Sequence, residues 1–135
     1  MEKERKRAND MNYPCPIQPN KASSDRDFNL AMTYCLDNIS QIACIIASHN
    51  EDSNLLATQQ LLHKNIIPAH SHVHFSQLYG MSDHITFNLA KAGYSVSKYL
   101  PFGPIEDVIP YLMRRAQENS SVSGQTGREL SLLKK

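Results

Sequence analysis

Three short apolar runs, each followed by a stretch of helical periodicity, limit the folds open to this chain. The runs are QIACIIASHN at 41–50, HSHVHFSQLYG at 70–80 and YSVSKYLPFG at 94–103. The first is continuous and rich in isoleucine, which is typical of a strand buried on both faces of a parallel sheet. The helical stretches cover 51–65, 82–93 and 104–120. This alternation predicts an α/β fold with about three parallel strand–helix units.

The domain organisation follows from the same pattern. A chain of 135 residues is long enough for one domain with a modest core. Residues 1–24 are expected to form the start of a helix and a proline-rich connector. The strand–helix units then occupy 25–120, and a tail rich in serine and glycine occupies 121–135. Three such units cannot close an eight-stranded barrel, which needs about 250 residues.

The connector and the helix after it are marked by proline and by capping residues. Pro14, Pro16 and Pro19 stand close together and exclude a regular helix between them. A helix is expected after them, with Ser24 or Asp25 as its N-cap.

Composition excludes several classes of protein. Hydrophobic residues make up 41% and charged residues 20% of the chain, and the net charge is +1. That balance argues against a general nucleic-acid binder, which would show a basic excess. No apolar run reaches the roughly 18–20 residues that span a bilayer, and the first ten residues lack the apolar segment of a secretory signal. Cys15, Cys35 and Cys44 are odd in number and widely spaced, which predicts reduced thiols.

The polar residues that follow each strand are the candidates for a site. In α/β folds the loops after the carboxyl ends of the strands carry function. Ser48, His49 and Asn50 directly precede a helix and could meet an anion or a polar ring there; the alternative is that they only cap the helix. Tyr99 is expected as the last residue of the third strand, pointing into the mouth of the sheet, and ordinary packing is its alternative role.

The last helix carries two adjacent arginines. If Pro110 restarts the helix, the side chains of Tyr111, Arg114, Arg115 and Glu118 share one side of it. Two guanidinium groups that converge on the flank of a helix would bind a carboxylate with bidentate geometry. The alternative is a solvated basic face with an intrahelical ion pair.

A row of histidines lies at the start of the second strand. His70, His72 and His74 alternate and would point to one face of a strand, where they could bind zinc. No acidic or thiol partner is adjacent, so semi-exposed polar surface is the favoured interpretation, and no metal is predicted.

Five stretches in order resemble the proline dehydrogenase family, in its stand-alone form. They are EKERKRA, ASHN, QLYGM, YLPFGP and YLMRRAQEN. The family fold that this resemblance implies is a distorted (β/α)₈ TIM-like barrel with FAD at the carboxyl ends of its strands. The chain would then be the C-terminal portion of the catalytic domain, incomplete as a barrel, starting just past the fifth strand.

The resemblance also implies a substrate site. Arg114 and Arg115 match the paired positions that grip the proline carboxylate, and Glu118 matches the acidic residue that we infer orients Arg115. Tyr99 and Leu78 match residues that line the proline pocket.

A cofactor site is implied in the same way. The segment Ser48, His49 and Asn50 matches the one that contacts FAD. No residue of this chain is assigned a certain catalytic role.

The function implied is oxidation of L-proline to 1-pyrroline-5-carboxylate by hydride transfer to FAD, with electrons passed to a membrane quinone. The localisation implied is the cytoplasm of a bacterium, or the matrix side of the mitochondrion in a eukaryote. The full-length protein could then contact the inner membrane peripherally. The isolated chain is expected to bind FAD weakly or not at all and to be inactive, because three strands leave an open edge. The alternative function is a non-catalytic α/β module that binds a small carboxylate or phosphate through the paired arginines.

Overall fold

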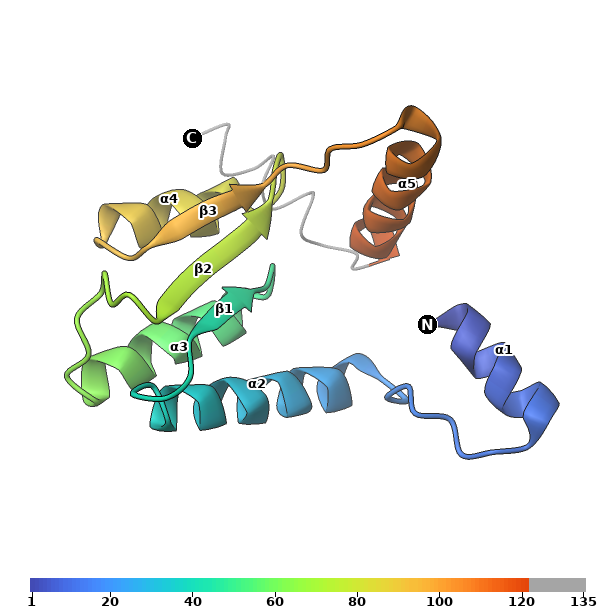
Figure 1. The fold of residues 1–135 in the computed structure, drawn as a ribbon, viewed down its shortest axis with the longest axis horizontal. Coiled ribbons are helices and arrows are strands. Elements are labelled where there is room, and N and C mark those ends of the chain that lie inside the picture. The colour runs from blue at the N-terminus through green and yellow to red at the C-terminus, as the bar shows by residue number, and fades with distance from the viewer. Residues whose placement is uncertain (122–135) are drawn as a thin grey trace.

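The three expected strands form one parallel sheet in the order β1–β2–β3 (Figure 1). The computed structural model describes the backbone of residues 1–121 and the side chains of residues 1–115. Its elements are α1 (Glu2–Met11), α2 (Lys21–Asp37), β1 (Cys44–Ala47), α3 (Glu51–His63), β2 (Val73–Leu78), α4 (Asp83–Lys91), β3 (Val96–Tyr99) and α5 (Ile105–Ser121). The α/β fold class with three parallel strand–helix units is confirmed. The predicted tail from residue 122 onward lies outside the described residues.

Register places the ends of the strands side by side. Ile46 pairs with Phe75, and Phe75 pairs with Val96 on the other side. The last pairs are Ala47 with Ser76 and Leu78 with Tyr99. All three strands run in one direction, so the loops that carry the predicted site residues leave the sheet at the same edge.

The core lies between the sheet and helices α2, α3 and α4. Phe75 is fully buried at its centre and meets Tyr94 edge to face, with ring centroids 5.4 Å apart. The other buried members of the cluster are Met32, Leu36, Ile46, Ala57, Leu61, Val73, Ile85 and Leu89. The core is formed by the apolar face of each helix and by the alternate residues of β2 that point towards the helices.

At β1 the opposite face of the sheet is not covered by the described residues. Ile45 of β1 is 68% exposed, and it lies on the same face as Ala47, which is exposed as well. The expectation that the first run is buried on both faces is therefore wrong for this chain, because α2, α3 and α4 pack on one side only.

Helix α2 begins earlier than the sequence predicted. Helix α2 starts at Lys21, and the N-cap is Asn20, whose side chain accepts a hydrogen bond from the Ser23 amide at 2.9 Å, rather than Ser24 or Asp25. The side-chain oxygen of an asparagine caps a helix as well as a hydroxyl or a carboxylate does, so Asn20 can start the helix before Ser24 or Asp25 is reached.

Helix α5 begins at Ile105 and continues through Pro110, so Pro110 does not restart the helix. The amides of Asp107 and Val108 both bond the Pro104 carbonyl and close the first turn. Pro110 removes one internal hydrogen bond, that to the Glu106 carbonyl, and the helix continues on the remaining ones.

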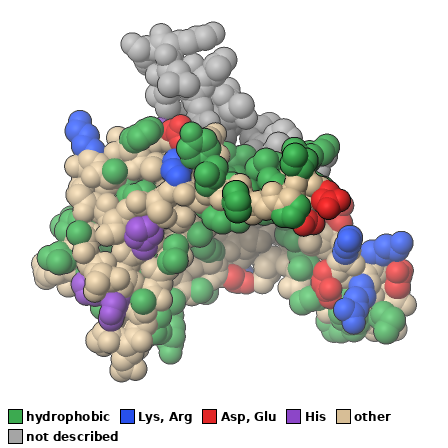
Figure 2. All heavy atoms as spheres, turned by 45° about the horizontal axis from the view of Figure 1, so that its top comes forward, with side chains coloured by type: hydrophobic (Ala, Val, Ile, Leu, Met, Phe, Trp, Pro, Cys, Tyr) green, Lys and Arg blue, Asp and Glu red, His purple; other side chains and the backbone are tan. Residues whose placement is uncertain are grey.

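Helix α1 and the connector form a separate, highly charged end of the molecule. Figure 2 shows acidic and basic side chains crowded together there, on the right of the view. The Tyr13 hydroxyl donates to the Glu4 carboxylate at 2.6 Å, and Arg5 donates to the Gln18 carbonyl at 2.6 Å, which ties the connector back to the helix. Hydrogen bonding to the Glu4 carboxylate raises the pKa of Tyr13 to about 12.

Two further expectations concern thiols and membranes. Cys15, Cys35 and Cys44 are free thiols, as their spacing predicted. Burial, and to a lesser degree the nearby Cys35, raises the pKa of the Cys44 thiol.

Within the described residues, none of the helices has the length and apolarity to cross a membrane.

Candidate functional site

A cavity of about 330 Å³ opens at the carboxyl ends of the three strands. We call it the strand-end pocket. It is lined by Ala47, His49, Ser76, Gln77, Leu78, Tyr99, Tyr111 and Arg115. Each strand supplies its last residues, and α5 closes one side with two side chains from successive turns.

Four of the residues predicted from the sequence meet in this pocket. His49 comes from the loop after β1, Leu78 and Tyr99 are the last residues of β2 and β3, and Arg115 comes from α5. Residues far apart in the sequence are thus brought to one place by the parallel register.

The two adjacent arginines do not share this environment. Arg115 is half-buried and lines the strand-end pocket, whereas Arg114 is exposed and is not among the lining residues. Adjacent positions on a helix differ by about 100° in direction, which separates the two side chains. The side chain of Glu118 lies outside the described residues.

Tyr111 joins the predicted residues of the pocket to each other. The Arg115 guanidinium carbon lies 5.5 Å from the centroid of the Tyr111 ring. The same ring meets Tyr99 edge to face, with centroids 6.4 Å apart. The sequence placed Tyr111 on the arginine side of the helix but assigned it no site role; its spacing of four from Arg115 was the available signal.

The loop after β1 is fixed by its own polar groups. The Asn50 side chain accepts from the Asp52 amide at 3.0 Å and from the Ser53 amide at 3.5 Å, so Asn50 is the N-cap of α3. The Ser48 hydroxyl accepts from the Asn50 amide at 3.1 Å. His49 contacts Ser82 through Nδ1 at 2.9 Å, and its Nε2 accepts from the Leu78 amide at 3.3 Å.

Two buried polar residues that the sequence did not single out support this loop. Asn54 is only 3% exposed, and its Nδ2 donates to the carbonyls of Ser48 at 3.1 Å and Asn50 at 2.8 Å. Gln77 donates to the Ser48 carbonyl at 3.3 Å and accepts from the Thr86 hydroxyl at 2.9 Å. A polar residue at a core position of a strand or helix was the signal, because such groups are buried only when hydrogen-bonded.

Comparison with known proteins identifies the family of this chain. The family model for proline dehydrogenase matches residues 1–128. The chain belongs to the proline dehydrogenase family.

Similar curated proteins carry related names. Proline dehydrogenase 1, mitochondrial, of Drosophila melanogaster is 41% identical over 143 residues, which cover 98% of this chain and 21% of that protein. The human protein of the same name is 41% identical over 133 residues, covering 96% and 22%. Hydroxyproline dehydrogenase of Xenopus laevis is 40% identical over 139 residues, covering 100% and 30%. The chain thus spans between a fifth and a third of the length of these relatives.

A solved structure of the family has the same fold. The crystal structure of proline utilization A (PutA) from Bdellovibrio bacteriovorus, inactivated by N-propargylglycine, superposes with a TM-score of 0.81 and 32% sequence identity. The match covers 90% of this chain and 12% of that one. An open sheet of three parallel strands within the proline dehydrogenase family fits the expected portion of a TIM-like barrel.

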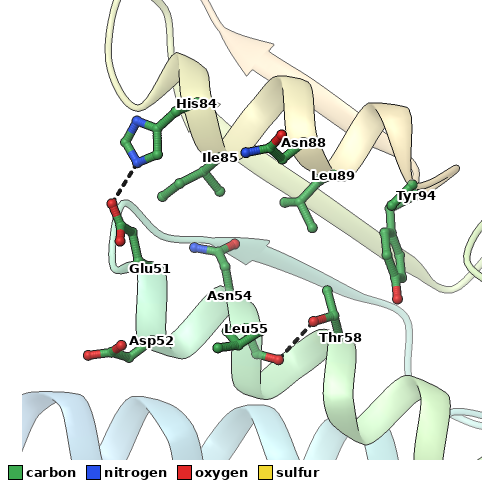
Figure 3. A pocket seen from close by; sticks show the side chains of 11 residues that line it. Glu51, Asp52, Asn54, Leu55, Thr58, His84, Ile85, Asn88, Leu89 and Tyr94 are labelled. Carbon is green, nitrogen blue, oxygen red and sulfur yellow. Dashed lines mark hydrogen bonds and ion pairs between the residues drawn. The ribbon is translucent and has the colours of Figure 1, made fainter. Parts of the chain in front are cut away.

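A second cavity lies between α3 and α4 (Figure 3). Its volume is about 510 Å³, and Leu55, Ile85 and Leu89 form apolar walls. At one end His84 Nε2 lies 2.7 Å from the Glu51 carboxylate, which joins the first turns of the two helices. No residue of the predicted site lines this cavity.

Two members of the histidine row, His70 and His72, form hydrogen bonds with nearby groups. His72 Nδ1 donates to the Ile39 carbonyl at 2.7 Å, and the His72 amide donates to His70 Nδ1 at 3.1 Å. Across the side chains that the structure describes, no three histidines, cysteines or carboxylates are grouped so as to hold a metal ion.

Proposed function

We propose that the strand-end pocket is the proline-binding part of a proline dehydrogenase and that the whole protein oxidises L-proline to 1-pyrroline-5-carboxylate. The observation that carries the proposal is the meeting of His49, Leu78, Tyr99 and Arg115 in one cavity at the strand ends. The family model and the curated relatives support the same chemistry.

Each side chain of the pocket has a role that suits a small cyclic amino acid. The Arg115 guanidinium is the donor for the substrate carboxylate, because its planar fork matches two carboxylate oxygens. Leu78 and the faces of Tyr99 and Tyr111 supply the apolar surface against the ring carbons. Arg114 then approaches the same carboxylate from the exposed flank of α5, and Glu118 orients Arg115.

The residues around Ser48 fit the flavin cofactor FAD. The Asn50 side chain caps α3 through its oxygen, and neither its Nδ2 group nor the Ser48 hydroxyl proton has a hydrogen-bond partner among the described residues. Two donors at the positive end of a helix suit a phosphate or a polar ring edge. When bound, FAD supplies the acceptor for the hydride that leaves the substrate carbon next to nitrogen. The protein groups bind and orient the reactants.

The remaining parts of the proposal concern the setting of the enzyme. Electrons pass on to a membrane quinone, and the site of action is the matrix side of the mitochondrion, in line with the names of the Drosophila and human relatives. We expect no turnover from the 135-residue chain alone, because its pocket opens onto an uncovered part of the sheet.

The test is a pair of titrations on the purified chain. Flavin fluorescence quenching measures FAD binding, and calorimetry with FAD present measures binding of L-proline. Weak FAD binding that Asn50→Ala diminishes, and proline binding that Arg115→Met abolishes, are expected. Thermal stabilisation by acetate or phosphate, with no binding of flavin, would instead indicate the non-catalytic module.

A further inference from the structure

His49 is held between two neighbours at the mouth of the strand-end pocket. The Leu78 amide lies 3.3 Å from His49 Nε2, and the Ser82 hydroxyl lies 2.9 Å from Nδ1. These neighbours belong to β2 and to the turn before α4, so one ring connects the loop after β1 to the loop after β2.

The chemistry of the two neighbours fixes the tautomer of the ring. A backbone amide can only donate, so Nε2 must accept and carry no proton. The ring proton of the neutral imidazole is then on Nδ1, where it points at the Ser82 hydroxyl oxygen. His49 therefore donates to Ser82 and accepts from Leu78.

Ser82 occupies an unusual backbone position for this task. It has a φ of 52° and a ψ of 42°, the left-handed region in which a side chain is disfavoured and glycine is preferred. Ser82 also stands at the N-cap of α4, yet its side chain makes no capping hydrogen bond. Its side chain is 6% exposed and bonds His49 instead.

The third strand holds the turn that carries Ser82. Lys98 of β3 donates to the Met81 carbonyl at 2.5 Å and forms an ion pair with Asp83 at 2.7 Å. The residues on both sides of Ser82 are thus tied to β3, while Ser82 itself contacts the loop after β1. The loops after β1 and β2 and the end of β3 form one connected arrangement.

We propose that Ser82 is a positioning residue: by accepting from Nδ1–H it holds the His49 ring in the orientation in which Nε2 meets the Leu78 amide, and the two contacts together keep the Nδ1–H tautomer at the edge of the strand-end pocket. The inference deepens the proposed function, because His49 belongs to the segment assigned to FAD. With both ring nitrogens engaged, His49 presents its carbon edge and ring face to a ligand and does not transfer a proton.

The experiment is long-range ¹H–¹⁵N NMR of the histidine side chains in the full 135-residue chain, with His49 assigned by His49→Gln. The wild-type chain should show His49 as a single Nδ1–H tautomer. In Ser82→Gly the ring should turn away from the Leu78 amide and give a mixture of tautomers. Thermal stability should be unchanged or higher, because glycine relieves the left-handed backbone. A role limited to the backbone would leave the tautomer as it was.

Matched variants complete the test. Ser82→Asn keeps an acceptor and tolerates the left-handed conformation, so it should restore the single tautomer. Ser97→Ala removes a different serine hydroxyl, bonded to Ser76 on the same sheet, and should leave the His49 signals unchanged. An Nε2–H tautomer in the wild type, or unaltered signals in Ser82→Gly, would overturn the proposal.

FAD affinity gives a second readout. Ser82→Gly should bind FAD about fivefold more weakly than the wild type, the equivalent of one hydrogen bond. If the 135-residue chain binds no FAD, the NMR result alone decides the role of Ser82, so failure of this inference remains distinguishable from failure of the proposed function.

Discussion

The guanidinium carbon of Arg115 lies 5.5 Å from the centroid of the Tyr111 ring, one turn earlier on α5. A cation above an aromatic face is attracted to it. The same ring contacts Tyr99 at the end of β3, so Tyr111 links the arginine on α5 to the sheet. The position of the charge in the strand-end pocket depends on this aromatic ring.

Replacing Tyr111 by leucine should weaken binding of L-proline. Loss of the cation–π contact costs about 0.5–1 kcal/mol at a partly exposed site, or roughly a two- to fivefold rise in Kd. Tyr111→Phe keeps the ring and should bind nearly as well as the wild type. Calorimetry with FAD present measures both; equal affinity of the leucine variant and the wild type would contradict the prediction.

The two arginines should respond differently to the same substitution. Arg115→Lys loses the bidentate geometry inside the pocket and should reduce affinity for proline about tenfold or more, since a hydrogen bond to a charged group contributes about 1.5–3 kcal/mol. Arg114→Lys, on the exposed flank, should cost less. Titration of both variants under one set of conditions decides, and a larger loss for Arg114→Lys would reverse the assignment.

The central core residue should dominate stability. Phe75→Ala removes a fully buried ring and should lower the free energy of unfolding by about 3–5 kcal/mol. Phe102→Ala, at a side chain 98% exposed, should change it by no more than about 0.5 kcal/mol. Urea denaturation followed by circular dichroism measures the two, and similar midpoints would contradict the core described above.

The contact between Tyr13 and Glu4 should be lost at high pH. Because the pKa of Tyr13 is raised from 10.0 to about 12 in the folded chain, its stabilising contribution is complete below pH 10 and disappears as the pH rises towards 12. Ultraviolet titration of the wild type minus Tyr13→Phe isolates this tyrosine. Glu4→Gln should move its midpoint down towards 10, and an unmoved midpoint would exclude Glu4 as the cause.

The three thiols should differ in reactivity. The thiolate is the reactive form, and burial raises the pKa of Cys44, so Cys44 should react slowly with iodoacetamide at pH 8. Cys15 is exposed and should react faster. Timed labelling followed by mass spectrometry of peptides measures the order; Cys44 reacting first would indicate local opening of the edge strand.

The order of elements was predictable from the sequence because local periodicity records which faces are buried. The isoleucine run at β1 and the alternation in β2 predicted strands, and the parallel sheet followed from the helices between them. The start of α2 was less predictable: Asn20 and Ser24 are both residue types that cap helices well, and the structure uses Asn20. Which face of the sheet is covered depends on how the helices pack, so the exposure of Ile45 could not be predicted from the isoleucine run.

The candidate site was predictable only in part. Spacing and family resemblance named His49, Leu78, Tyr99 and Arg115, and the parallel register brings these four together. The contact between His49 and Ser82 joins residues 33 positions apart and has no local signature. Ser82 is distinguished by its left-handed backbone conformation, and this conformation cannot be predicted from the amino-acid sequence.

The uncovered face of the sheet makes binding and packing linked equilibria. The strand-end pocket opens onto the same face as Ile45, so a polypeptide that covers Ile45 and also contacts the bound ligand would raise the affinity for that ligand. By reciprocity, the ligand raises the affinity of that polypeptide by the same factor. Proline and cofactor bound at the strand ends would therefore also favour binding of the covering polypeptide to the sheet. Measuring the affinity of that polypeptide with and without ligand would then report the coupling between the two binding events.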